Sequence, residues 1–142
     1  MDMDSNSQAQ SAYFQGIGQI DFVFQLARWN VVELGNLLDT DFIHKEGSSD
    51  FANVADDFSL LSERKPEWKE LSESFKDASN RFSALLACTP YTAAEGQQWL
   101  GSSDAGKYFW SDELVSEFVK DLQLLSSAAT NLSASFSEVK PA

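Results

Sequence analysis

The sequence contains only one cysteine, one histidine and three prolines in 142 residues. Because Cys88 has no second cysteine to pair with, no internal disulfide can form, which favours a reducing compartment. His44 alone cannot supply a histidine-based metal site, a Ser-His-Asp triad or the paired Glu-x-x-His motifs of a di-iron bundle. We therefore expect no resident metal, no cofactor and no enzymatic activity.

Basic residues are also scarce. Ten Lys and Arg stand against 22 Asp and Glu, which gives a net charge of −12 at neutral pH. Direct binding to nucleic acid requires a basic patch, and an anionic membrane surface would repel this chain, so both partners are disfavoured. A basic protein partner fits such a surface better, and plain solubility is the alternative explanation of the charge.

The sequence has no long apolar run without charges. The most apolar segment, residues 17–38, is interrupted by Asp21, Arg28 and Glu33, which argues against a membrane span. The first residues are acidic and polar rather than basic and then apolar, unlike a signal peptide. We expect a soluble, cytoplasmic protein, with secretion without a leader as the alternative.

What the sequence does contain is helical periodicity, strongest in residues 17–38. Apolar residues recur there at spacings of three and four, on one helical face: Ile17, Ile20, Phe24, Ala27, Val31, Leu34 and Leu38. Five more are expected to widen that face: Phe22, Val23, Leu26, Trp29 and Leu37. The polar strip that remains is narrow: Gly18, Asp21, Gln25, Arg28 and Asn36. A helix this apolar predicts the hub of a helical bundle.

Three more helices follow from similar signals. A second is expected from about Asp50, its N-cap, to Arg64, and Pro66 starts a third. The third helix carries a narrow seam at spacings of three and four: Trp68, Leu71, Phe75, Ala78, Phe82 and Leu85. The last long helix begins near Ser111 and has the inward stripe Leu114, Phe118, Leu122, Leu125, Ala129, Leu132, Phe136 and Val139.

Two segments of the sequence carry capping signals for helices. Ser5 and Gln8 form a potential capping box, so the first helix begins as early as Ser5, after a frayed tail within residues 1–10. Thr92 and Glu95 form a second box, which predicts a short helix through Leu100. The fold prediction is therefore all-α: a single-domain helical bundle over residues 1–142, with four principal helices plus a short connecting helix.

Residues 101–107 match the glycine and lysine positions of a phosphate-binding P-loop. Position 108 is Tyr, where magnesium binding needs Ser or Thr, and the preceding segment is expected to be helical rather than a strand. We therefore expect no nucleotide binding.

Two groups of acidic residues are candidates for recognition. The preferred group surrounds the first connection between helices, because loops carry recognition more often than bundle flanks do. Its members are Asp39, Asp41, Glu46, Asp50, Asp56 and Asp57. The second group is a ridge on the third helix, for which a solvated face is the default interpretation: Glu63, Glu67, Glu70, Glu73 and Asp77.

Aromatic and polar residues give two further candidates. Aromatic residues before the last helix are expected to cap the bundle, or to form an exposed interaction cluster: Trp99, Tyr108, Phe109 and Trp110. Gln19, Asn30 and Glu33 lie within the widened apolar face of the hub helix. They are expected to form a buried hydrogen-bonded group that fixes register, with a ligand-lining role as the alternative.

These observations favour a non-enzymatic acidic binding protein that docks on a basic protein partner and inhibits it. Immunity proteins and antitoxins offer an analogy in charge and architecture, and a nucleic-acid mimic is a variant of the same idea. One alternative is a helical enzyme or small-ligand binder with a pocket near the hub helix. The other is an oligomerising structural bundle, since a homo-oligomer is compatible with the sequence.

Overall fold

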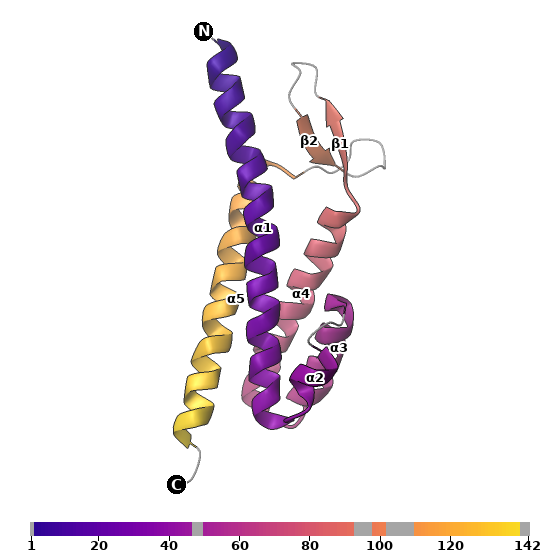
Figure 1. The fold of residues 1–142 in the computed structure, drawn as a ribbon, viewed down its shortest axis with the longest axis vertical. Helices are drawn as coiled ribbons and strands as arrows, with labels where there is room; N and C mark the ends of the chain where they lie inside the picture. Colours follow the sequence, from indigo (N-terminus) through magenta and orange to yellow (C-terminus); the bar gives the residue numbers. More distant parts are fainter. Residues whose placement is uncertain (1, 47–49, 93–97, 102–109, 140–142) are drawn as a thin grey trace.

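The computed structural model describes residues 2–46, 50–92, 98–101 and 110–139. Figure 1 shows an all-α bundle with one small β-hairpin. Its elements are α1 (Asp2–Leu38), α2 (Phe42–Glu46), α3 (Phe51–Ser62), the 3₁₀ helix η1 (Pro66–Trp68), α4 (Lys69–Leu86), β1 (Thr89–Thr92), β2 (Gln98–Gly101) and α5 (Asp112–Val139). The four principal helices α1, α3, α4 and α5 confirm the expected fold class. Helix α1 begins at Asp2 and so covers most of the segment expected to be frayed.

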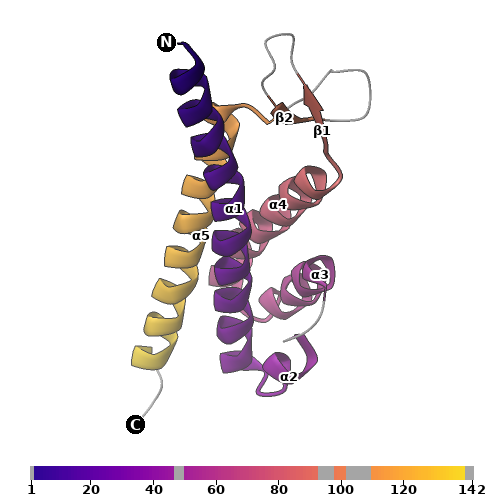
Figure 2. The same ribbon diagram turned by 45° about the horizontal axis from the view of Figure 1, so that its top comes forward.

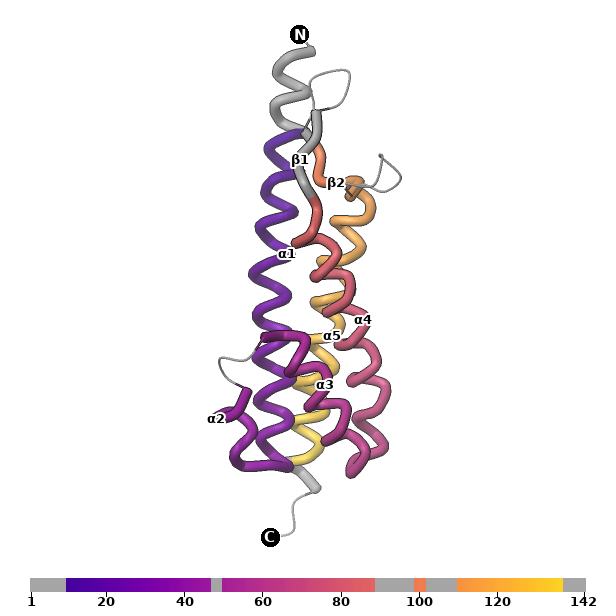
Figure 3. Tube along the Cα trace, turned by 90° about the vertical axis from the view of Figure 1, so that its right-hand side faces the viewer, coloured from indigo at the N-terminus to yellow at the C-terminus, as the bar shows by residue number. Residues whose placement is uncertain are grey.

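The two longest helices, α1 and α5, lie side by side, and α3 and α4 pack together on the other side of α1 (Figures 1 and 3). The hairpin lies at the end of the bundle where α5 begins, and α2 lies at the opposite end, below α3 (Figure 2). Among the described helices, none combines the length and apolar character that crossing a bilayer requires.

The aromatic ring of Phe24 lies at the centre of the core. It is fully buried and stacks on Phe82 of α4, with ring centroids 4.1 Å apart. The edge of a third ring, Phe51 of α3, meets Phe24 at 5.3 Å, and Phe75 of α4 lies at 6.0 Å. One side chain of the hub helix therefore joins three helices, through pair geometries that aromatic rings favour.

The expected inward faces of the other helices are confirmed. All six residues of the seam from Trp68 to Leu85 are buried. Of the α5 stripe, Phe118, Leu122, Leu125 and Ala129 are buried and Leu114, Leu132 and Phe136 are half-buried, while the side chain of Val139 lies outside the described part of the structure. At the far end of the bundle Trp68 stacks on Phe58 at 5.8 Å and contacts the ring of Phe136 at 6.0 Å. The Pro66 start is confirmed as well, as the first residue of η1.

The widened apolar face of α1 is the first wrong prediction. Val23 is buried, but the other four members of that set are exposed: Phe22, Leu26, Trp29 and Leu37. The long helices pack against the face that holds Phe24, and the exposed residues lie on the opposite side of α1. Gln19 and Glu33 are exposed with them and Asn30 is half-buried, so the buried polar group expected there does not form.

The polar strip of α1 is instead where α2 docks. Arg28 Nη2 donates a hydrogen bond to the Glu46 carbonyl oxygen at 2.8 Å. The backbone N–H of Ile43 donates to Asn36 Oδ1 at 3.0 Å, and Gly35 leaves room for the ring of Phe42. Side chains that looked solvent-facing by polarity therefore hold a neighbouring element by hydrogen bonds.

The short connecting helix is the second wrong prediction. The segment forms the antiparallel hairpin β1–β2, with Tyr91 opposite Trp99. The hairpin is fixed to α1 through Tyr13, whose hydroxyl accepts from Leu100 N–H at 3.1 Å and donates to the Trp110 carbonyl at 2.7 Å. These contacts join residues 87 and 97 positions apart in the sequence, so a local capping signal could not reveal them.

A first prediction tests the helical phase of α1. Phe24→Ala should lower the free energy of unfolding by about 3–5 kcal/mol, because it removes a fully buried ring and leaves a cavity. Phe22→Ala is the matched control on the same helix and should cost far less, since that ring is 71% exposed. Urea unfolding of both variants measures the difference. Equal losses would contradict the assignment of buried and exposed faces.

A second prediction uses two glycines of α1. A Cβ added at Gly35 would lie 2.5 Å from the Phe42 ring, so Gly35→Ala should displace α2 and cost about 1–3 kcal/mol. A Cβ at Gly18 meets nothing within 4 Å, so Gly18→Ala should stabilise the helix by up to about 1 kcal/mol. Thermal unfolding of both variants checks the opposite signs. A stabilising Gly35→Ala would show that α2 does not pack there.

Candidate functional site

A groove of about 840 Å³ runs between α4 and α5. Its carboxylates come mainly from the α4 side: Glu67, Glu70, Glu73, Asp77 and, from α5, Asp121. Its apolar lining comes from both helices: Leu71, Ala78, Leu124, Leu125, Ala128 and Leu132. Ser74, Arg81 and Asn131 complete it. The groove thus combines an acidic rim with an apolar floor.

Small side chains explain why the two helices leave this space. Ala78 of α4 and Ala128 of α5 both line the groove, and neither fills the space that a larger side chain would occupy. The second half of α5 is rich in Ser and Ala, as residues 126–135 show. Helix α5 packs most extensively against α1 rather than α4, so its α4-facing side stays partly open.

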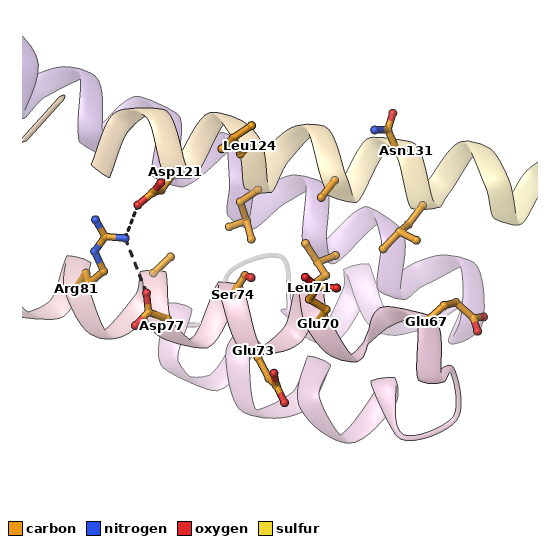
Figure 4. Close-up of a pocket in the computed structure, with 14 residues that line it drawn as sticks. Glu67, Glu70, Leu71, Glu73, Ser74, Asp77, Arg81, Asp121, Leu124 and Asn131 are labelled. Atoms are coloured by element: carbon orange, nitrogen blue, oxygen red, sulfur yellow. Dashed lines mark hydrogen bonds and ion pairs between the residues drawn. The ribbon is translucent and has the colours of Figure 1, made fainter. Parts of the chain in front are cut away.

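Arg81 closes one end of the groove, as Figure 4 shows. Its Nη1 lies 2.9 Å from Asp121 Oδ2 on α5 and 3.8 Å from Asp77 Oδ2 on α4. The guanidinium also lies over the ring of Phe118, 4.3 Å from its centroid. A cation is thus bound here by two carboxylates and an aromatic face, an arrangement suited to arginine.

The lining of the groove is strongly negative. Five carboxylates against the single guanidinium of Arg81 leave it a net charge of −4. At the open end Lys65 Nζ lies 2.9 Å from Glu67 Oε1, and this hydrogen bond lowers the pKa of the Glu67 carboxyl. Glu70 and Glu73 are exposed, and no ion pair of theirs appears among the described side chains.

In the sequence, the ridge that contributes to this groove was the second of the two acidic candidates. All four α4-side carboxylates of the groove belong to the ridge for which a solvated face was the default interpretation, and the α5 contribution from Asp121, Leu124 and Asn131 was missed. The Ser- and Ala-rich half of α5 indicated a helix face with little bulk. Only the packing of α5 beside α4 shows that the two helices line one groove.

The preferred acidic group is divided by the structure into different roles. Glu46 is buried, so its carboxylate does not belong to an exposed surface. Asp39 accepts from Asp41 N–H at 3.1 Å and lies 3.6 Å from Lys45 Nζ, which places it in the α1–α2 turn. Asp50 accepts from Ala52 N–H at 3.4 Å as the N-cap of α3. The remaining members are exposed: Asp41, Asp56 and Asp57.

The aromatic candidates are divided as well. Trp110 is buried and its ring contacts Phe118 at 5.5 Å, while Trp99 is half-buried with its ring 4.9 Å from Tyr13. Both therefore cap the bundle. Tyr108 and Phe109 lie outside the described residues.

The single thiol has a structural environment. Cys88 Sγ donates to the Ala84 carbonyl at 3.2 Å, and the side chain packs against the core just after α4. Burial raises the pKa of the thiol, against a smaller lowering by a hydrogen bond with Trp110. A thiol with a raised pKa is a poor nucleophile at neutral pH. Within the described ranges, no three potential metal-ligating side chains converge.

The P-loop-like segment needs one correction. It follows strand β2 rather than a helix, since β2 ends at Gly101. That strand belongs to a two-stranded antiparallel hairpin, and α5 begins only at Asp112, five residues after Lys107. In a P-loop the helix opens at the lysine itself, so that its N–H groups face the phosphates. Residues 102–109 lie outside the described part of the chain.

Comparison of the chain with protein-family models, with curated proteins and with solved structures found no match in any of the three.

A third prediction concerns nucleotides. ATP and GTP with magnesium should not bind, because Tyr108 follows the lysine at the position where a P-loop needs a magnesium-binding hydroxyl. Isothermal titration calorimetry should show no heat of binding. Micromolar affinity that disappears in Lys107→Ala would contradict this interpretation.

Proposed function

We propose that the protein is a non-enzymatic binding protein whose α4–α5 groove holds a basic amphipathic helix of a protein partner. The observation that carries the proposal is the pairing of an acidic rim with an apolar floor in one groove. A helix with Lys or Arg on its flanks and apolar residues between them is complementary to both parts. Helix-in-groove recognition is a common mode of peptide binding.

The dimensions of the groove support a helical occupant. Its lining extends from Glu67 to Arg81 along the α4 side, about 21 Å at the rise of an α-helix. A partner helix of about four turns fits that length. Apolar contacts with the floor would supply most of the affinity, whereas the carboxylates would accelerate encounter and set orientation.

The biological effect that fits this mode is inhibition of the partner. A helix held in the groove is covered on the face it presents, so any function of that basic face is blocked while the complex lasts. The net charge of −12 adds long-range attraction toward a basic partner. Asp56 and Asp57 are exposed as well, but neither of them lines the groove.

A fourth prediction tests the groove with a synthetic probe: a labelled peptide of about four helical turns with Lys on its flanks and Leu between them. Fluorescence anisotropy should show saturable binding that weakens as salt rises, because screening reduces the attraction. The double variant Glu70→Lys, Glu73→Lys should weaken binding by about tenfold or more. Asp56→Lys, Asp57→Lys makes the same change in net charge outside the groove and should weaken it much less.

A second pair of variants tests the apolar lining. Leu124 lines the groove and is 63% exposed, so Leu124→Ser should weaken peptide binding without destabilising the fold. Leu60 of α3 is 64% exposed and lies outside the groove lining, so Leu60→Ser is the matched control and should bind normally. Equal effects of the two charge reversals, together with no effect of Leu124→Ser, would show that attraction is only general and would overturn the proposal.

A further inference from the structure

At both ends of the α4–α5 groove, a cation of this chain already engages the carboxylates. Figure 4 shows Arg81 at one end, between Asp77 and Asp121, and Glu67 at the other. At the Glu67 end, Lys65 Nζ lies 2.9 Å from Glu67 Oε1. Two carboxylates and one guanidinium give the Arg81 end a net charge of −1, whereas one carboxylate and one ammonium leave the Glu67 end neutral.

Aromatic rings of α5 also hold both cations at these ends. The Arg81 guanidinium lies 4.3 Å from the centroid of the Phe118 ring, and Lys65 Nζ lies 5.1 Å from the centroid of the Phe136 ring. Both basic side chains are half-buried. Since the face of an aromatic ring attracts a cation, each of the two has a second contact besides its carboxylate. A basic residue of a partner would have to replace both contacts to take over the carboxylates at either end.

The middle of the groove lacks such a cation. Glu70 and Glu73 line the groove and are exposed, and neither has an ion pair among the described side chains. Lys69 and Lys76 lie on the same helix, but neither of them lines the groove or forms an ion pair within the described part of the chain. The two carboxylates give the middle a charge of −2, so it is more negative than either end.

Glu70 and Glu73 are close enough to act together. They are three residues apart on α4, so their side chains are neighbours on the surface of the helix. Neighbouring like charges on a helix repel each other and destabilise it. A cation that a partner places between them would remove this repulsion, and it would not have to displace a cation of this chain.

We infer that the partner helix carries its Lys or Arg residues in its central turns, opposite Glu70 and Glu73, and neutral or acidic residues in its terminal turns. The inference rests on the proposed function, because it requires that the groove hold a basic amphipathic helix. It adds where along the helix axis the positive charge lies. The pattern is the same for both directions of the bound helix, since the ends of the groove are both less negative than its middle.

Two labelled peptides of identical composition test this inference. Both have about four helical turns and an apolar stripe flanked by charged residues, and both carry the same net positive charge. The central-Lys peptide has Lys in its two central turns and Glu in both terminal turns, and the terminal-Lys peptide has the reverse arrangement. Within each peptide the two terminal turns are alike, which balances the interactions of their charges with the helix dipole.

Fluorescence anisotropy should show that the central-Lys peptide binds about tenfold or more tightly than the terminal-Lys peptide. General attraction to an acidic protein depends on net charge, which is equal in the two peptides, so it cannot produce this difference. Rising salt should reduce the difference, because it screens the local charges.

Matched variants assign the difference to named carboxylates. Glu70→Gln, Glu73→Gln removes the charge of the middle and should abolish the preference for the central-Lys peptide. Asp56→Asn, Asp57→Asn removes the same net charge outside the groove and should preserve the preference. Circular dichroism should show an intact fold in both double variants, since all four side chains are exposed.

A variant at one end tests the inference from the opposite direction. Lys65→Gln leaves Glu67 without its cation, so that end becomes negative. The terminal-Lys peptide should then bind more tightly than it binds the wild type, and the affinity of the central-Lys peptide should change much less.

Three results would overturn the inference: equal affinity of the two peptides for the wild type, tighter binding of the terminal-Lys peptide, or a preference that persists in Glu70→Gln, Glu73→Gln. In each case, weaker binding by Leu124→Ser would show that the groove is still the binding site, so the proposed function would stand. Binding of neither peptide would overturn the proposed function together with the inference.

Discussion

The stacking of Phe24 on Phe82 is the contact on which the arrangement of the bundle depends. The two rings lie 4.1 Å apart and bring α1 against α4, while Phe51 and Phe75 add α3 and a second turn of α4 to the same cluster. Because this cluster places one face of α1 in the core, it also determines where the other faces of α1 point. The polar strip meets α2, and the opposite side of α1 is left facing solvent.

The groove follows from the same constraint. Helix α5 packs along α1, and α4 is held against α1 and α3 by its aromatic seam, so α4 and α5 meet each other only in part. Small residues such as Ala78 and Ala128 leave space between the two helices. Arg81 bridges the two helices at one end, where Asp77 and Asp121 both reach its guanidinium. The same chemistry that joins the helices there would bind a basic side chain supplied by a partner.

Periodicity in the sequence was sufficient to locate the long helices and the buried stripe of each. It was not sufficient for the width of the buried face of α1, because Phe22 and Phe24 are equally apolar and only tertiary packing decides which of the two is buried. The hairpin was missed because its strands are four residues long and depend on Tyr13, which is distant in sequence. Acidity predicted a negative surface but could not locate it. Glu46 is buried and Asp50 caps a helix, whereas Glu70 lines a groove that exists only between two helices.

Hydrogen–deuterium exchange in the presence of the basic amphipathic peptide tests whether the groove is the binding site, because it locates the bound peptide on the native chain. The peptide should slow exchange in α4 and in the part of α5 between Asp121 and Leu132, with little change in α3. Slower exchange confined to α2 and α3 would place recognition at the first connection between helices. It would contradict the assignment of binding to the groove.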